Sequence, residues 1–206
     1  MFDPVLRPLK DRALEPVTLR LARVDPNAIT AAAAILGLGS AALAWTDRMG
    51  PALGLWLANR TLDGLDGAVA RRHGTGSDLG GFLDLVSDFV VYAAIPVALA
   101  LRPGADPALP AAALVLLATF YVNAAAWMVS SAILEGRGLG AREGGEPTTV
   151  VIPEGLVSGT ETVVLYALFF LVPSRQVLLF QAMAVLTAVT VVQRVTWARR
   201  EFRSPR

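Results

Sequence analysis

The sequence contains no cysteine and only one histidine, His73, among its 206 residues. Without cysteine the chain has no disulfide, no thiolate metal ligand and no cysteine nucleophile. Its formal net charge is only +1 at pH 7. This balance excludes neither lipid nor nucleotide partners, because the positions of the basic residues matter more than their sum. For His73, in a short polar loop, contact with solvent or lipid phosphate is a simpler interpretation than catalysis.

Long apolar runs dominate what the sequence does contain. Hydrophobic residues make up 54% of the chain and the mean hydropathy is +0.55, as is typical of a polytopic membrane protein. Taking about 20 apolar residues as one span, we predict an all-α bundle of six transmembrane helices. The second span is interrupted by charged residues, but the strong spans on either side require it. The predicted spans are Ala28–Thr46, Gly50–Arg71, Leu79–Leu101, Ala108–Leu134, Leu156–Val172 and Gln176–Trp197.

The chain is expected to have three parts. Residues 1–25 mix apolar and basic residues and carry too much charge for a signal peptide, so they predict an amphipathic segment at the lipid surface. Residues 26–198 form the six-helix domain, and residues 199–206 form a basic tail. Lys and Arg gather at both termini, with Arg194 counted in the terminal group, and in the loops after spans two and four. The positive-inside rule therefore predicts cytoplasmic termini.

Four carboxylates interrupt the second and third spans near the same membrane surface. Asp63 and Asp66 are three residues apart, Asp84 and Asp88 are four apart, and each pair therefore shares a helix face. Two antiparallel helices joined around His73–Ser77 would bring all four together on the cytoplasmic side. Such a cluster needs protons or cations to neutralise it, and Mg²⁺ with a substrate phosphate fits best.

The spacing of this segment is also a recognisable motif. It reads Asp63-x2-Asp66-Gly67-x2-Ala70-Arg71-x8-Gly80-x3-Asp84-x3-Asp88. The pattern resembles, without a departure, the signature of the CDP-alcohol phosphotransferase family. The residues Pro26 to Thr30 also resemble a segment found at this place in many members. The stretch Glu154–Thr162 is similar to a bacterial branch of the family, which leaves the acceptor open.

The resemblance implies a reaction and assigns roles. A CDP-linked donor, usually CDP-diacylglycerol, would pass its phosphatidyl group to an alcohol with release of CMP. The implied cofactor is Mg²⁺, or Mn²⁺ in its place, as one or two ions. The implied metal ligands are Asp63, Asp66, Asp84 and Asp88, with Asp88 also the general base, and the CDP site is shaped by Gly67, Ala70, Arg71 and Gly80. A homodimer in the inner membrane of a bacterium, in contact with membrane lipid and without a nucleic-acid partner, is also implied.

The residues themselves are consistent with these roles. Gly67 and Ala70 follow Asp63 on the same helix face and leave it without bulky side chains, so a base or pyrophosphate could approach the backbone. Gly80 does the same on the facing helix. Arg71 stands at the cytoplasmic end, where a guanidinium binds phosphate oxygens with paired hydrogen bonds.

Other polar residues leave alternatives open. Glu154 and Glu161 could reach the acceptor. Alternatively, Glu154 could cap the start of the fifth span while Glu161 pairs with a basic residue such as Arg60. Arg137 and Arg142 could bind a phosphorylated acceptor or be ordinary cytoplasmic charges. The polar residues of the fourth span, Asn123, Ser130 and Ser131, are interpreted as contacts between helices.

Two other functions remain as hypotheses. Carboxylates inside a membrane also mark ion pathways, so a divalent-cation transporter is one of them. Polar groups do not continue from the cluster to the far leaflet in this sequence, which argues against it. The other is a catalytically inactive lipid-binding relative, against which all four Asp are retained.

Overall fold

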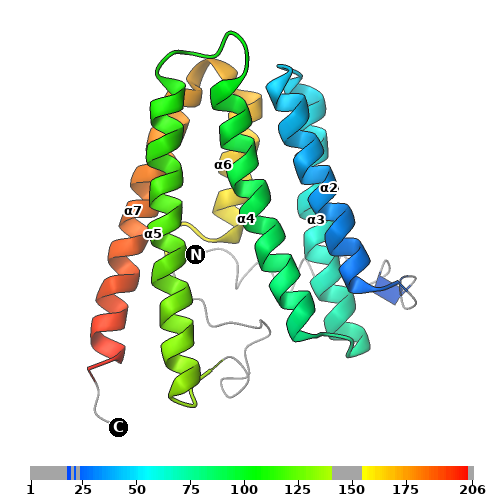
Figure 1. The fold of residues 1–206 in the computed structure, drawn as a ribbon, viewed down its shortest axis with the longest axis vertical. Coiled ribbons are helices and arrows are strands. Elements are labelled where there is room, and N and C mark those ends of the chain that lie inside the picture. The colour runs from blue at the N-terminus through cyan, green and yellow to red at the C-terminus, as the bar shows by residue number, and fades with distance from the viewer. Residues whose placement is uncertain (1–17, 20, 22–23, 141–154, 204–206) are drawn as a thin grey trace.

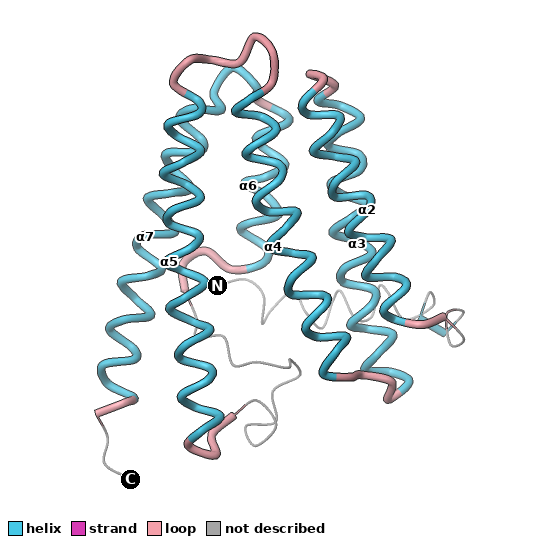
Figure 2. The backbone as a smooth tube through the Cα atoms, in the orientation of Figure 1, coloured by secondary structure: helices cyan, strands magenta, loops and turns pink. Residues whose placement is uncertain are grey.

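The computed structural model describes residues 18–19, 21, 24–140 and 155–203. All regular secondary structure in these residues is helical, as predicted (Figure 2). The predicted interfacial segment 1–25 lies mostly outside the described residues, as do residues 204–206 of the tail. The helices are α2 (Pro26–Trp45), α3 (Met49–His73), α4 (Asp78–Leu101), α5 (Leu109–Gly136), α6 (Gly159–Leu171) and α7 (Gln176–Glu201), with a short 3₁₀ turn, η1 (Pro173–Arg175), before α7.

Four segments of the described chain are long and apolar enough to cross a membrane. They are α2, α4, α5 and the continuous run of η1 and α7. Helix α3 has 25 residues but carries the charged residues of the motif. Helix α6 has only 13 residues and a length of about 20 Å, which is short for a hydrocarbon core of about 30 Å. The number of six spans therefore stays a prediction.

Helix α6 is shorter than the predicted span because a cap fixes its start. Ser158 and Glu161 form a capping box. The Ser158 side chain accepts a hydrogen bond from the backbone amide of Glu161, and the Glu161 side chain accepts one from the backbone amide of Ser158. The preceding residues are held on α7 instead, where the Leu156 amide donates to Gln193 (2.8 Å) and the Val157 amide to Thr190 (3.0 Å). Glu161 thus has a structural role in the start of the helix.

The helices pack in two groups. Helices α2 and α3 run side by side and α4 packs on α2, while α5 pairs with α7 (Figure 1). Helix α6 joins the groups, because it contacts both α3 and α7. The centre of the bundle is aromatic and includes the fully buried Trp56, Tyr166, Phe169 and Phe180. The first group carries the whole motif.

The connection between α3 and α4 brings the two halves of the motif together. Gly74 ends α3 in the left-handed conformation (φ 63°), which glycine adopts without strain. Arg71, Arg72 and His73 fill the last turn of α3, where positive charge favours the helix C-terminus. Ser77 then caps α4 by accepting a hydrogen bond from the Gly80 amide (3.0 Å). The short loop predicted here is confirmed.

Close packing of α2 on α4 depends on Gly37. A Cβ added at this position would lie 2.5 Å from Cγ2 of Val91 and 3.1 Å from Nδ2 of Asn59. Both neighbours are buried, and Val91 is stiff because it is β-branched. We expect Gly37→Ala to destabilise the protein by about 1–3 kcal/mol through overpacking, measured as a lower midpoint of thermal unfolding in detergent.

Two further variants control this prediction. Gly54→Ala is the matched substitution on α3, since a Cβ there would meet nothing within 4 Å, and it should unfold at the wild-type temperature. Val91→Ala added to Gly37→Ala removes the clashing methyl groups and should recover part of the loss. A Gly37→Ala protein that unfolds like the wild type would show that α2 and α4 are less tightly packed than described.

Candidate active site

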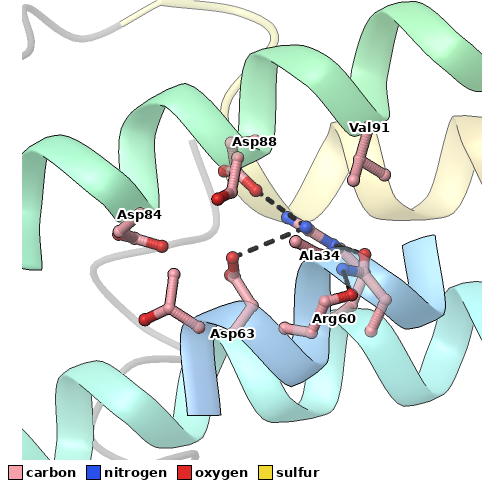
Figure 3. A pocket seen from close by; sticks show the side chains of 10 residues that line it. Ala34, Arg60, Asp63, Asp84, Asp88 and Val91 are labelled. Carbon is pink, nitrogen blue, oxygen red and sulfur yellow. Dashed lines mark hydrogen bonds and ion pairs between the residues drawn. The ribbon is translucent and has the colours of Figure 1, made fainter. Parts of the chain in front are cut away.

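A pocket between α2, α3 and α4 contains three of the four motif carboxylates. Figure 3 shows Asp84 and Asp88 on α4 facing Asp63 and Arg60 on α3. The antiparallel hairpin produces this arrangement, because Asp63 lies before the turn and the α4 pair lies after it. The residues lining the pocket are Thr30, Ala33, Ala34, Asn59, Arg60, Asp63, Asp84, Ser87, Asp88 and Val91.

An ion pair dominates the centre of the pocket. Nη2 of Arg60 lies 2.7 Å from Oδ1 of Asp88 and 3.5 Å from Oδ1 of Asp63. The Arg60 side chain is only 8% exposed, whereas the two carboxylates are 26% and 27% exposed. The guanidinium therefore forms the inner wall of the pocket, with the carboxylates between it and the entrance. Asp63 and Asp88 lie at the same level of their helices, as the antiparallel arrangement predicts.

The fourth carboxylate, Asp66, is oriented toward α2. It is 5% exposed, and its Oδ2 accepts a hydrogen bond of 2.6 Å from the Thr30 hydroxyl. Thr30 lines the pocket, but Asp66 is outside the set of lining residues. The structure thus brings three of the predicted ligands to one pocket and places the fourth behind Thr30. Within the described residues, no group of three acidic or histidine side chains is arranged to hold a metal ion.

The residues predicted to shape the nucleotide site lie at the same end of the hairpin. A Cβ on Gly67 would lie 3.1 Å from Nη1 of Arg71, so the bare backbone at Gly67 gives room to the arginine side chain. A Cβ on Gly80 would lie 3.0 Å from Oδ1 of Asn27. Ala70 is partly buried and Arg71 is exposed. Both glycines therefore already serve close contacts within the protein.

Comparison with known proteins supports one family for this arrangement. A model of the family described as CDP-alcohol phosphatidyltransferase matches residues 23–195, which include the whole pocket. This chain belongs to the CDP-alcohol phosphatidyltransferase family. It is accordingly a membrane-associated transferase of phosphatidyl groups.

Relatives of this CDP-alcohol phosphatidyltransferase agree with the assignment. Inner membrane protein YnjF of Escherichia coli (strain K12) is 33% identical over 176 residues, which cover 84% of this chain and 81% of YnjF. The fold is similar to that of phosphatidylinositol phosphate synthase (PgsA1) of Mycobacterium tuberculosis. The PgsA1 structure with CDP-DAG bound has a TM-score of 0.69 at 21% identity and covers 90% of this chain and 92% of PgsA1. The structure with manganese and citrate has a TM-score of 0.68 at 21% identity, with 88% and 86% covered.

The chemistry of the donor atoms in this phosphatidyltransferase, rather than their arrangement in this structure, suits a hard divalent cation. The pocket offers carboxylate oxygens, which Mg²⁺ and Mn²⁺ prefer. The Thr30 hydrogen bond orients Asp66 in the way that neighbouring groups orient metal ligands. Asp63, Asp66 and Asp84 are the residues that would hold one ion, and Asp88 is the predicted base that would also contact a second; these roles stay predictions.

Several residues outside the motif have partners within the protein. The proposed Glu161–Arg60 pair is wrong, because Arg60 contacts Asp63 and Asp88 and Glu161 caps α6. Arg137 donates to the Phe202 carbonyl (3.2 Å) and lies over the Phe202 ring. A ring nitrogen of His73 lies 3.2 Å from the Thr18 carbonyl oxygen. Glu154 and Arg142 lie outside the described residues.

Two arginines lie in environments that hydropathy and charge counting do not predict. Hydropathy marks Arg60 only as an interruption of the second span, but its position one helical turn before Asp63 places the two side chains on the same helix face. Charge counting places Arg194 with the basic C-terminus, but its side chain is buried and donates from α7 to Oδ1 of Asn123 on α5 (2.8 Å). The interpretation of Asn123 as a helix contact is confirmed.

Proposed function

We propose that this pocket transfers a phosphatidyl group from CDP-diacylglycerol to the hydroxyl of an alcohol and releases CMP, with Mg²⁺ as the divalent cation and Mn²⁺ as its substitute. The observation that carries the proposal is the meeting of Asp63, Asp84 and Asp88 in one pocket of a chain that matches the family over residues 23–195. The PgsA1 relative of the same fold has been seen with CDP-DAG, which supports this donor.

The proposed reaction is a direct displacement at phosphorus. The acceptor oxygen forms a bond to the phosphorus of the phosphatidyl group, and the bond from that phosphorus to the bridging oxygen of CMP breaks. The hydroxyl proton passes to the carboxylate of Asp88, and CMP leaves with the electron pair of the broken bond. A divalent cation held by Asp63, Asp66 and Asp84 would offset the negative charge that develops on CMP.

The donor headgroup is assigned to the hairpin end of the pocket. Arg71 is exposed there, at the C-terminal turn of α3, and its guanidinium can bind phosphate oxygens in pairs. Gly67, Ala70 and Gly80 border this region with little side-chain bulk. We assign this end, together with both termini, to the cytoplasmic side of a bacterial inner membrane, and we keep the homodimer and the parts 1–25, 26–198 and 199–206 as proposals.

The packing inward of the pocket favours a transferase over an ion pathway. Trp56 and Tyr166 are completely buried there, with ring centroids 4.9 Å apart. Their polar atoms are occupied, since Trp56 donates to the Val163 carbonyl (3.3 Å) and Tyr166 to the Tyr92 carbonyl (2.7 Å). An ion would have to displace this aromatic cluster to pass further, so the pocket is suited to chemistry at one membrane surface.

The test is CMP release by the purified protein in detergent with CDP-diacylglycerol and Mg²⁺. Each acceptor is assayed separately: glycerol phosphate, inositol, inositol phosphate, serine, choline, ethanolamine and phosphatidylglycerol. We expect CMP formation that requires one acceptor and stops with a chelator. Donor binding without CMP release for any acceptor would contradict the proposed transfer and support the inactive lipid-binding relative.

A further inference from the structure

All three guanidinium nitrogens of Arg60 donate hydrogen bonds within the protein. Its Nη2 contacts Asp88 (2.7 Å), its Nη1 donates to the Tyr92 hydroxyl (2.9 Å), and its Nε donates to Oδ1 of Asn59 (2.7 Å). Each of the three guanidinium nitrogens thus has a fixed partner. A planar fork with three directed bonds has one orientation available to it.

The partners of Arg60 are themselves fixed by other helices. Asn59 donates from Nδ2 to the Ala33 carbonyl on α2 (2.7 Å), and the Tyr92 backbone on α4 accepts from Tyr166 on α6. The guanidinium carbon also lies 4.9 Å from the Trp56 ring centroid and 5.0 Å from that of Tyr92, within the range of cation–π attraction. Four helices therefore determine where this positive charge stands.

The held guanidinium acts on Asp88 in two ways. The short contact to Oδ1 fixes the rotamer of the carboxylate that is assigned as the general base, and a base works only if its oxygen meets the hydroxyl proton. The same positive charge stands beside Asp63, an assigned metal ligand, and it must repel any divalent cation bound there. Arg60 thus fixes the position of Asp88 and at the same time lowers the affinity of the pocket for the cation.

We propose that Arg60 is a positioning residue, which holds Asp88 for proton transfer and lowers the affinity of the carboxylate cluster for the divalent cation. This inference rests on the proposed function. A purely structural ion pair would behave differently, because loss of its arginine would loosen the pocket and weaken both metal binding and turnover. The positioning role instead predicts that loss of Arg60 raises Mn²⁺ affinity and lowers kcat.

The experiment compares Arg60→Gln and Arg60→Lys with the wild type in detergent. Mn²⁺ binding is titrated by electron paramagnetic resonance without substrate, and kcat and donor KM are measured from CMP release. Arg102→Gln is the matched control, because Arg102 is also a largely buried arginine, paired with Asp47 at 3.2 Å and Gln176 at 2.7 Å, outside the pocket.

For Arg60→Gln we expect tighter Mn²⁺ binding by about three- to tenfold, because a repelling charge is gone. We expect kcat to fall by about 30- to 100-fold at nearly unchanged donor KM, because Asp88 is no longer held. Arg60→Lys keeps the charge but not the fork, so Mn²⁺ affinity should stay at the wild-type value while kcat is only partly recovered. Arg102→Gln should change neither quantity.

Three outcomes would overturn the proposal. They are unchanged or weaker Mn²⁺ binding in Arg60→Gln, an unchanged kcat, or equal losses in Arg60→Gln and Arg102→Gln. If Arg60→Gln does not fold, Arg60→Lys decides, since a lower kcat at wild-type Mn²⁺ affinity supports the proposal and wild-type values for both overturn it. A wild-type protein without CMP release would contradict the proposed function separately. The Mn²⁺ titration would still test whether Arg60 lowers the affinity of the carboxylates for the cation.

Discussion

Asp88→Asn is expected to lower kcat by about 10³-fold, within the range usual for loss of a general base. The asparagine keeps an Oδ1 that can accept the hydrogen bond from Arg60, so the geometry of the pocket should persist. It cannot take the proton of the acceptor hydroxyl, because an amide is not a base near neutral pH. Turnover is measured as CMP release with the acceptor that supports CMP formation by the wild-type protein in the panel assay.

Binding measurements separate this chemical loss from a damaged site. Mn²⁺ affinity and donor binding should remain within a few-fold of the wild type in Asp88→Asn. The matched control is Asp106→Asn, where Oδ1 accepts from the Ala108 amide (2.8 Å) outside the pocket and asparagine can do the same. This control should be fully active. Full activity of Asp88→Asn itself would remove Asp88 from the role of base.

Asp63→Ala is expected to abolish divalent-cation binding and, with it, turnover. Loss of residues that merely support metal ligands already costs about 10- to 100-fold in affinity, so loss of an assigned ligand should cost about 100-fold or more. Removing Asp63 also leaves the positive charge of Arg60 with one carboxylate fewer, which further opposes a cation. The measurement is again Mn²⁺ titration without substrate.

A graded series makes the ligand role of Asp63 testable. Asp63→Asn keeps one oxygen donor but loses the negative charge, so its Mn²⁺ affinity should fall between those of the wild type and Asp63→Ala. High Mg²⁺ should recover part of the activity of Asp63→Asn and none of that of Asp63→Ala. Wild-type Mn²⁺ affinity in Asp63→Ala would place the metal elsewhere and leave Asp63 only as a partner of Arg60.

The sequence by itself determined the features that depend on local chemistry. Apolar runs predicted the helices, with boundaries close to those observed for α2, α4 and α7. The turn between α3 and α4 was predicted around His73–Ser77, where Gly74 ends α3 in the left-handed conformation and Ser77 caps α4, because a helix end and a helix cap depend on one or two side chains. The spacing of Asp63, Asp84 and Asp88 predicted their common location, since periodicity determines which residues share a helix face.

Only the tertiary structure decided which partner each polar group takes across helices. Periodicity predicts which residues share a helix face but not which residue of another helix lies opposite them. It therefore could not predict the Thr30–Asp66 hydrogen bond or the Arg60–Asp88 ion pair. The same reason explains Arg194, which looked like a terminal charge and is buried against Asn123. Helix α6 begins later than hydropathy predicts because its capping box fixes its first turn and the residues before it are held on α7. Charge pairing and packing between distant segments thus turned a predicted cluster of carboxylates into an asymmetric site, with one arginine inside it.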